Sequence, residues 1–321
     1  DGIYYDVSTF KGYGKLSGRT TEPAEDAVSR IDEGIDKRNK ADFVLWKISK
    51  PDEPQWDSPW GKGRPGWHIE DTAITEKHLG EQYDIHGGAR DLIFPHHEAE
   101  ISQMEAISGK EPLVRYWMHT GFLTVGSEKM SKSTGNFITI QEFIKKYSPR
   151  LLRYFILKAH YRSPIDYAET HMQQSQKELE RIDEFVARLE RIDKEGSFQQ
   201  GMIDEKRKAF VDAMDDDFNT PNAIAALFEL TKEGNKAIDQ DNFGKEDAQA
   251  ILSLLEEWDA VLNVILKPKS DIPEAVQQLV NEREAFREQA DWDKTDELRE
   301  LIEAKGYAVQ DTPAGPILKR K

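Results

Sequence analysis

The chain has 321 residues, of which 38% are hydrophobic and 32% are charged, which predicts a soluble globular protein of two or three domains. It contains no cysteine, so disulfides and thiolate metal sites are excluded, and no run approaches the roughly 18 apolar residues of a membrane span. The net charge of −16 argues against a generally basic nucleic-acid binder, although a local basic face could still bind RNA, and we expect a cytoplasmic location by default.

The first 60 residues predict short strands and turns. Residues 3–7 and 42–47 have strand composition, and a charged loop at 32–39 lies between them. Four prolines between Pro51 and Pro65 indicate an irregular approach to Gly66-Trp67-His68.

Residues 66–120 indicate alternating helices and strands. We expect helices at 70–79 and 96–108 and strands at 83–86 and 115–119. Such alternation favours a parallel sheet.

From residue 140 onward the pattern is helical. An apolar stripe from Phe143 to Leu157 is most simply a core face, and the longer amphipathic helices are expected at 170–194, 204–214, 221–239 and 245–265. Pro268 and Pro273 frame a linker, and residues 272–321 predict two helices followed by strands at 307–310 and 317–318 around a turn, which is a small α+β unit.

Two polar segments could carry chemistry. His86-Gly87-Gly88 follows a strand, where paired glycines could let the backbone approach a nucleotide or could simply make a tight turn into a helix. His96 and Glu100 are four residues apart on one helix face, a spacing that suits two ligands of one metal ion. For either pattern alone, the structural reading is favoured: a turn in the first case and a polar helix start in the second.

Residues 124–136 are the most informative stretch. The motif Lys129-Met130-Ser131-Lys132-Ser133 has two lysines that could close over the phosphates of ATP as charge builds in a transition state. Gly126 and Gly135 flank it. Such a pentapeptide alone is usually a solvated turn, but the extended motif resembles the second ATP motif of class I aminoacyl-tRNA synthetases.

Taken in order, these segments resemble the cysteinyl-tRNA synthetase family over essentially the whole chain. Residues 5–18, 214–221 and 311–315 agree with the same family. The resemblance implies a partial Rossmann-type catalytic core, a helical-bundle anticodon-binding domain and a small C-terminal α+β module. The implied boundaries are 1–62 for the remainder of an insertion within the catalytic domain, 63–120 for the second half of the core, 121–178 for the lysine-loop and stem-contact region, 179–268 for the bundle, and 269–321 for the anticodon-recognition module.

The resemblance also implies roles for individual residues. His86, Gly87 and Gly88 would contact adenosine, and the lysine motif would contact the phosphates, with Lys129 and Lys132 catalytic. Asp91 would bind the ammonium group of the substrate. Trp67 would line the pocket for the substrate side chain, although a lone Trp is more often part of a protein core. The expected base contacts, chosen because Arg and Trp stack on bases and carboxylates accept from their amines, are Arg287, Trp292, Asp296 and Asp311. A solvated helix charge is an almost equal alternative for Asp296.

Two departures from the family matter. The N-terminal His-x-Gly-His motif and the first zinc cysteine are absent, so we expect that an N-terminal part is missing or is a separate polypeptide and that this chain alone makes adenylate poorly. Asp71 stands where the family usually has a zinc-binding cysteine, which leaves Asp71, His96 and Glu100 as the metal set. Carboxylates are harder ligands than thiolates, so this site could hold zinc weakly, hold another metal, or hold none.

The expected function is ATP-dependent attachment of L-cysteine to its tRNA through a cysteinyl adenylate, with Mg-ATP as substrate. One alternative is a non-catalytic tRNA-binding fragment. Another is the related ligase that joins cysteine to an amino-sugar inositol, which lacks the C-terminal module expected at 272–321.

Overall fold

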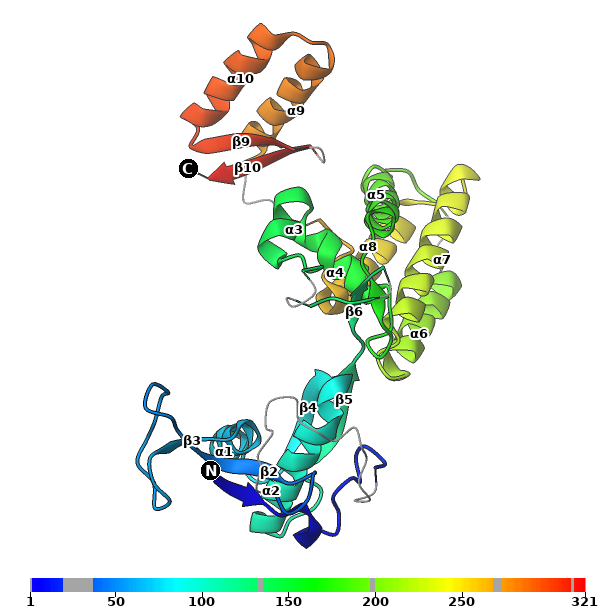
Figure 1. Cartoon of the computed structure of the whole chain (residues 1–321). Helices are drawn as coiled ribbons and strands as arrows, with labels where there is room; N and C mark the ends of the chain where they lie inside the picture. Colours follow the sequence, from blue (N-terminus) through cyan, green and yellow to red (C-terminus); the bar gives the residue numbers. More distant parts are fainter. Residues whose placement is uncertain are drawn as a thin grey trace. The chain divides into compact units, whose positions relative to one another are not determined.

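The computed structural model describes residues 2–19, 37–126, 128–131, 135–196, 200–267, 273–312 and 315–320. The chain divides into two compact units, Asp1–Phe122 with Arg162–Pro164 and Leu123–Tyr161 with Ile165–Lys321. Figure 1 labels most of the helices and strands of both units. In the described part of the chain, no helix is both long and apolar enough to cross a membrane.

An antiparallel sheet of three strands lies at the start of the first unit. Strand β1 (Gly2–Tyr5) pairs with β2 (Phe43–Ile48), and β2 pairs with β3 (Gly63–Pro65). The two predicted strands are confirmed, but the expectation of an irregular segment up to Pro65 is wrong at its end. Because β3 is an edge strand, Pro65 can lie in it without breaking a central ladder. Residues 32–36 of the predicted charged loop lie outside the described residues.

The second half of this unit is a βαβ arrangement. Helix α1 (Trp67–Leu79) precedes β4 (Tyr83–Ala89), and α2 (Glu98–Ser108) connects β4 to the parallel strand β5 (Val114–Thr120). The predicted parallel pairing is confirmed. A small core packs between the sheet and α2, formed by Ile101, Met104, Leu113 and Val114.

Two predicted boundaries in this region are wrong. Strand β4 continues to Ala89, so Gly87 and Gly88 pair with Met118 and His119 inside the sheet instead of forming a tight turn. The α-helix expected from His96 begins at Glu98, because a π-helical turn (η3, Ile93–His97) with an extended Phe94 and a cis Phe94–Pro95 bond comes first.

The second unit begins with a small sheet and two helices. Strand β6 (Leu123–Val125) pairs antiparallel with β7 (Glu128–Lys129) and parallel with β8 (Ile165–Asp166). Helices α3 (Ile140–Lys146) and α4 (Pro149–Leu157) follow the lysine motif, and each begins at a capping side chain, Thr139 and Ser148 respectively. The predicted apolar stripe is confirmed as a core face: Phe143, Leu151 and Tyr154 are at most 3% exposed.

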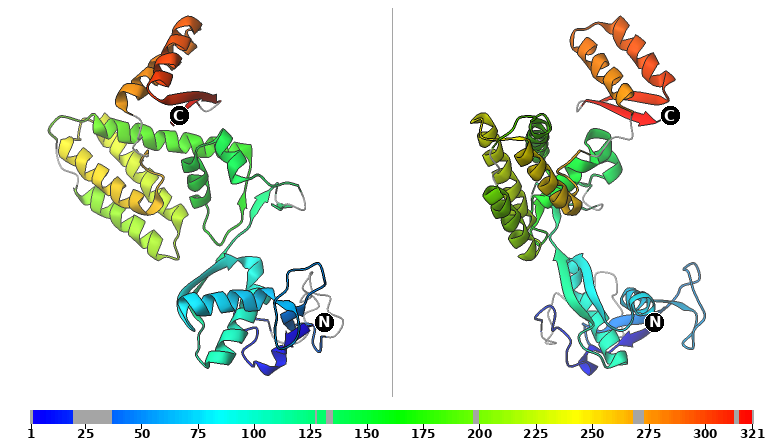
Figure 2. Two further views of the ribbon diagram at one scale, coloured as in Figure 1. Left: turned by 90° about the vertical axis from the view of Figure 1, so that its left-hand side faces the viewer. Right: turned by 180° about the vertical axis from the view of Figure 1, so that it is seen from behind.

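Four long helices form a bundle: α5 (Glu169–Glu190), α6 (Gln200–Asp215), α7 (Thr220–Asp239) and α8 (Lys245–Leu262). The sequence periodicity predicts four long helices in this region, and they lie side by side in Figure 2. Fully buried side chains such as Phe185, Leu227 and Trp258 fill the centre, and Phe210 stacks on Trp258 with ring centroids 4.6 Å apart.

The C-terminal module has the predicted α+β composition. Helices α9 (Glu274–Glu288) and α10 (Trp292–Ala304) precede an antiparallel hairpin of β9 (Tyr307–Thr312) and β10 (Gly315–Arg320). Its own small core is formed by Val276, Val280, Ile302, Tyr307 and Val309. Pro268 of the predicted linker and Pro313 and Ala314 of the predicted turn lie outside the described residues.

Candidate active site and metal cluster

Two carboxylate side chains and one histidine side chain come together where α1 packs against α2. Nε2 of His96 lies 2.7 Å from Oδ2 of Asp71 and 3.0 Å from Oε1 of Glu100. The donor atoms of all three residues lie within 4.8 Å of one another. The structure therefore brings together all three residues that the sequence nominated as metal ligands.

Glu100 is the unusual member of this cluster. It is 1% exposed, and among the described residues the groups at ion-pair distance from its carboxylate are histidines. Its polar neighbours are His96 at 3.0 Å and Nδ1 of His86 at 3.7 Å, both at ion-pair distance. A buried carboxylate is costly unless it is paired, and a protonated histidine or a bound cation compensates for it.

Trp67 and His68, at the start of α1, surround the cluster. Nδ1 of His68 lies 2.6 Å from Nδ1 of His96, so His96 contacts another histidine through one nitrogen and the carboxylates through the other. Such a contact behind a metal-binding histidine fixes the ring orientation. The ring centroids of Trp67 and His96 lie 4.3 Å apart. Because Trp67 is 54% exposed, its indole leaves an apolar face open beside the cluster.

The environment shifts the pKa values of two adjacent histidines in opposite directions. Burial acts to lower the pKa of His96, but the carboxylates of Glu100 and Asp71 outweigh it, and the pKa is raised above its usual value. Burial, with the nearby His86, His119 and His96, lowers the pKa of His97 to about 3. His97 is therefore neutral at physiological pH.

The glycine strand lies against this second histidine. Nδ1 of His97 lies 2.9 Å from Nε2 of His119 on β5, and its ring centroid is 4.7 Å from that of His86 on β4. A Cβ atom at Gly88 would come within 2.7 Å of Cε1 of His97, so only glycine fits there without a shift. At Gly87 the nearest atom would be 3.9 Å away, so that backbone is open. Asp91 follows in a short 3-10 turn (η2, Arg90–Leu92) and is exposed.

The lysine motif belongs to the second unit, and the structure describes only its first part. Lys129 ends strand β7, and the N–H of Met130 donates to the carbonyl of Leu123 at 2.9 Å. The N–H of Ser131 donates to Oδ1 of Asn136, also at 2.9 Å, which closes the base of the loop. Lys132 and Ser133 lie outside the described residues.

The four tail residues expected to contact bases fall into two groups. Arg287 donates to Asp311 at 3.0 Å, and the buried Arg283 holds both oxygens of the same carboxylate. Trp292 and Asp296 lie one turn apart at the start of α10, and both are exposed, Trp292 by 60%. A base contact by Asp311 would therefore compete with two arginines, whereas Trp292 is open for stacking.

The sequence predicts no role for His68, His97 or His119. In the structure His68 contacts His96, and His97 contacts His119. His68 and Asp71 are three residues apart on α1, a spacing that places them on one face and could have suggested that they act together. His119 gave no such signal, because only the strand register brings it to His97.

Three family models match successive parts of the chain. The tRNA synthetases class I (C) catalytic domain matches residues 1–177, the DALR domain matches residues 209–267, and the cysteinyl-tRNA ligase anticodon binding domain matches residues 269–315. A crystal structure titled as the ternary complex of Agrobacterium radiobacter K84 agnB2 LeuRS, tRNA and LeuAMS is similar in fold, with a TM-score of 0.51 and 14% identity over 66% of this chain and 32% of that one. Fold and catalytic domain together define a class I aminoacyl-tRNA ligase.

Curated relatives narrow the class to one family. The cysteine–tRNA ligase of Thermococcus onnurineus is 44% identical over 336 residues, which cover 100% of this chain and 70% of the relative. Those of Carboxydothermus hydrogenoformans and Bacillus licheniformis are 42% and 40% identical, covering 99% of this chain and 70% and 69% of the relatives. The chain belongs to the cysteine–tRNA ligase family, as its motifs predict.

Proposed function

We propose that the protein attaches L-cysteine to its tRNA in two steps, formation of cysteinyl adenylate from Mg-ATP and transfer of the acyl group to the terminal ribose. The observation that carries this proposal is the convergence of Asp71, His96 and Glu100 beside the open indole of Trp67, in a chain that resembles cysteine–tRNA ligases throughout. Catalysis would depend mainly on positioning and on stabilisation of phosphate charge.

In the first step, the glycine strand and the lysine motif would hold ATP. The open backbone at Gly87 supports close approach of the adenosine, with His86 and Gly88 beside it. Lys129 and Lys132 would meet the phosphates, and Met130, Ser131 and Ser133 would form the rest of the loop. The hydrogen bond between Ser131 and Asn136 supports a loop with a fixed base.

Cysteine would lie between the indole of Trp67 and the carboxylate cluster. The exposed carboxylate of Asp91 would receive its ammonium group. A metal ion held by Asp71, His96 and Glu100 would bind the substrate thiolate and thereby favour cysteine over serine. The buried carboxylate of Glu100, which faces His96 and His86, supports a cation at this position.

The donor set of this site affects its preference among metal ions. Two carboxylates and one imidazole offer harder ligands than a set containing thiolates, so we propose a site that prefers zinc less strongly than a cysteine-containing one. His68 would orient the imidazole of His96 from behind.

The remaining segments would bind tRNA. We propose the division expected from the sequence, with 63–120 as the second half of the catalytic core, 121–178 contacting the stem, 179–268 as the tRNA-binding bundle and 269–321 recognising the anticodon. In the last module the exposed Trp292 supports stacking on an unpaired base, with Arg287, Asp296 and Asp311 as further contacts.

Adenylate formation would also require polypeptide that covers the sheet of β4 and β5. Ile85 and Tyr116 are partners in this sheet, yet they are 59% and 68% exposed. Parallel sheets are normally covered on both faces, so this surface favours a further layer carrying the rest of the catalytic core. Without that further layer, the same exposed surface favours a second candidate function, that of a non-catalytic tRNA-binding protein.

Cysteine-dependent exchange of pyrophosphate into ATP tests the first step and separates the two candidates. The enzyme would support exchange with cysteine and not with serine. A tRNA-binding protein without catalysis would bind the tRNA but support no exchange, and a ligase for an amino-sugar acceptor would support exchange without charging tRNA.

A further inference from the structure

Glu98 is a buried carboxylate that binds a distant part of the chain. It is the first residue of α2 and is 0% exposed. Its Oε2 accepts a hydrogen bond from the backbone N–H of Gly14 at 3.0 Å, and its Oε1 accepts from the N–H groups of Leu16 and Ser17 at 2.7 and 2.6 Å. Three backbone donors compensate for the cost of burying this charge, so they hold the loop firmly against the start of the helix.

Residues 13–19, which we call the Glu98-bound loop, also contact the segment that precedes the metal cluster. The ring of Tyr13 lies edge-on to that of Phe94, with centroids 6.1 Å apart. The guanidinium carbon of Arg19 lies 4.8 Å from the centroid of the same Phe94 ring. Phe94 is the extended residue within η3, so the backbone leaves the helical path at the residue that the loop contacts.

His96 lies between these two points of contact. Phe94 precedes it by two residues, and Glu98 follows it by two residues. His96 is buried, and its Nε2 faces the carboxylates of Asp71 and Glu100. A ligand in such a cluster must be held within about 0.5 Å of its productive position. A loop that is attached on both sides of His96 restricts the movement of its backbone.

A second glutamate on α2 contacts the same loop, but farther along the helix from His96. Glu105 lies seven residues after Glu98, on the same helix face, and it is also buried. One of its oxygens pairs with Nζ of Lys15, and the other accepts from the N–H of Leu113 at 3.0 Å. Glu105 therefore helps to attach the loop without lying next to the metal cluster in the sequence, which makes it a matched control for Glu98.

We propose that Glu98 is a positioning residue for His96, which acts through the Glu98-bound loop to fix the imidazole where it can bind a metal ion together with Asp71 and Glu100. This inference rests on the proposed function, which assigns a metal ion to that cluster. Both oxygens of Glu98 accept from backbone N–H groups of the loop, so its role is to orient a ligand and not to bind the ion itself. A role in folding alone would make Glu98 and Glu105 equivalent toward the metal.

Titration of the full chain with cobalt(II), followed by visible absorption of the bound ion, measures affinity and coordination geometry together. Glu98→Gln keeps the side-chain volume but replaces one acceptor oxygen by an NH2 group, so at least one hydrogen bond to the loop is lost. We expect about tenfold weaker cobalt binding and a changed absorption spectrum, as when a metal-binding histidine loses a supporting contact. Glu105→Gln should change the affinity less than about twofold and leave the spectrum unchanged.

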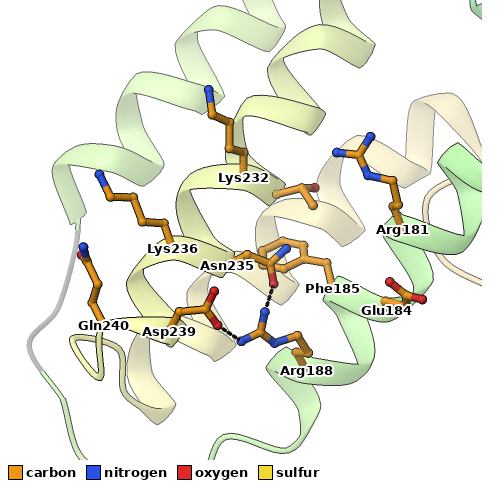
Figure 3. A pocket seen from close by; sticks show the side chains of 10 residues that line it. Arg181, Glu184, Phe185, Arg188, Lys232, Asn235, Lys236, Asp239 and Gln240 are labelled. Carbon is orange, nitrogen blue, oxygen red and sulfur yellow. Dashed lines mark hydrogen bonds and ion pairs between the residues drawn. The ribbon is translucent and has the colours of Figure 1, made fainter.

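A second control tests the effect of net charge. Asp239→Asn removes one negative charge at an exposed position in the bundle, which belongs to the other unit. Its carboxylate accepts from Arg188 at 2.5 Å in a groove between α5 and α7, as Figure 3 shows. We expect the same cobalt affinity and spectrum as in the wild type.

Phe94→Leu tests the inference without changing Glu98. It removes the ring that Tyr13 and Arg19 contact, so the loop loses its attachment on the other side of His96. We expect cobalt binding to weaken by more than about twofold. This variant keeps the inference testable if Glu98→Gln does not fold, and circular dichroism at the titration temperature shows which variants are folded.

Several outcomes would overturn the inference. Equal losses of cobalt affinity in Glu98→Gln and Glu105→Gln would show that only attachment of the loop matters. An unchanged affinity and spectrum in folded Glu98→Gln or Phe94→Leu would show that the loop does not position His96. A wild-type chain that binds no cobalt, or a His96→Ala variant that binds it equally well, would overturn the proposed metal site itself, so the two failures are distinguishable.

Discussion

Arg283 and Asp311 form a bidentate ion pair that connects α9 to β9 in the C-terminal module. Nη1 and Nη2 of Arg283 donate to the two carboxylate oxygens at 2.8 and 2.9 Å. Arg283 is 2% exposed, and its buried charge is compensated mainly by Asp311, with Glu284 at 2.6 Å as a second carboxylate partner. The same carboxylate accepts from Arg287, which links two of the proposed base-contacting residues to the stability of the module.

Asp311→Ala should destabilise the module, because it leaves the buried Arg283 without its main partner. Breaking a fully buried pair costs more, but the Asp311 side chain is 33% exposed, so we expect about 1–3 kcal/mol in the free energy of unfolding. Urea unfolding measures this value. Asp296→Ala, at an exposed position on α10, is the control and should cost less than about 0.5 kcal/mol. Equal effects of the two substitutions would contradict a structural role for Asp311.

The same pair predicts a pH dependence at the acidic end. Hydrogen bonds from Arg283, aided by its charge and that of Arg287, lower the pKa of Asp311 despite partial burial. A carboxyl whose folded pKa lies below its unfolded value contributes stability above about pH 4, and this contribution is lost as the pH falls through the folded pKa. The difference in unfolding free energy between wild type and Asp311→Asn should therefore shrink below about pH 4. A difference that is constant from pH 7 to pH 3 would rule this out.

Gly88→Ala should disturb the first unit far more than Gly87→Ala. The new methyl group at Gly88 would press on the buried ring of His97, whereas at Gly87 the nearest atom is 3.9 Å away. Overpacking of this kind costs about 1–3 kcal/mol, and we expect a lower thermal unfolding temperature for Gly88→Ala only. Comparable unfolding temperatures for the two variants would show that the His97 ring moves aside freely.

Lys132→Ala in the protein carrying the complete catalytic core should cut adenylate formation about 10²–10³-fold, with a much smaller effect on cysteine binding, because the charge it meets develops in the transition state. Pyrophosphate exchange reports the rate. Lys145→Ala, at an exposed position on α3, serves as the control. Exchange within threefold of the wild type would refute the role of Lys132.

Removal of residues 272–321 should raise the KM for tRNA and leave pyrophosphate exchange nearly unchanged. The module has its own hydrophobic core, so its loss should not unfold the remainder of the chain. Circular dichroism of the shortened protein provides the folding control. Loss of exchange in a folded deletion variant would show that the module supports the catalytic fold.

The metal cluster predicts substoichiometric zinc after dialysis. Asp71, His96 and Glu100 offer three ligands, two of them carboxylates, and Asp71 is 38% exposed, so zinc should be held more weakly than by thiolates. Elemental analysis gives the occupancy. One tightly held zinc per chain, lost in His96→Ala, would show instead that this donor set is sufficient for zinc.

Most elements of the fold could be predicted from the sequence, because hydrophobic periodicity fixes them locally. The stripe through Phe143, Leu151 and Tyr154 predicted a buried helical face correctly, and the four long bundle helices follow the same rule. Strand β3 was missed because Gly63-Arg64-Pro65 has no strand composition and is defined only by pairing with β2. The predicted strand ends at His86, before Gly87 and Gly88, because glycine has low strand propensity and its place in β4 depends on pairing with β5.

The candidate site was predictable in part. His96 and Glu100 come close because they lie in consecutive helical turns, but the approach of Asp71 to His96 depends on how α1 packs on α2, which no local pattern encodes. Only the family resemblance brought Asp71 into the set. The contacts of His97 with His119 and of His68 with His96 likewise arise from tertiary packing.

Charging of a cysteine tRNA transcript, with the protein isolated in the form that its source cells make, tests the central claim most directly. We expect ATP-dependent accumulation of cysteinyl-tRNA from labelled cysteine, and no charging with labelled serine. A tRNA that stays uncharged with cysteine, although the protein binds both ATP and the tRNA, would contradict the proposed function.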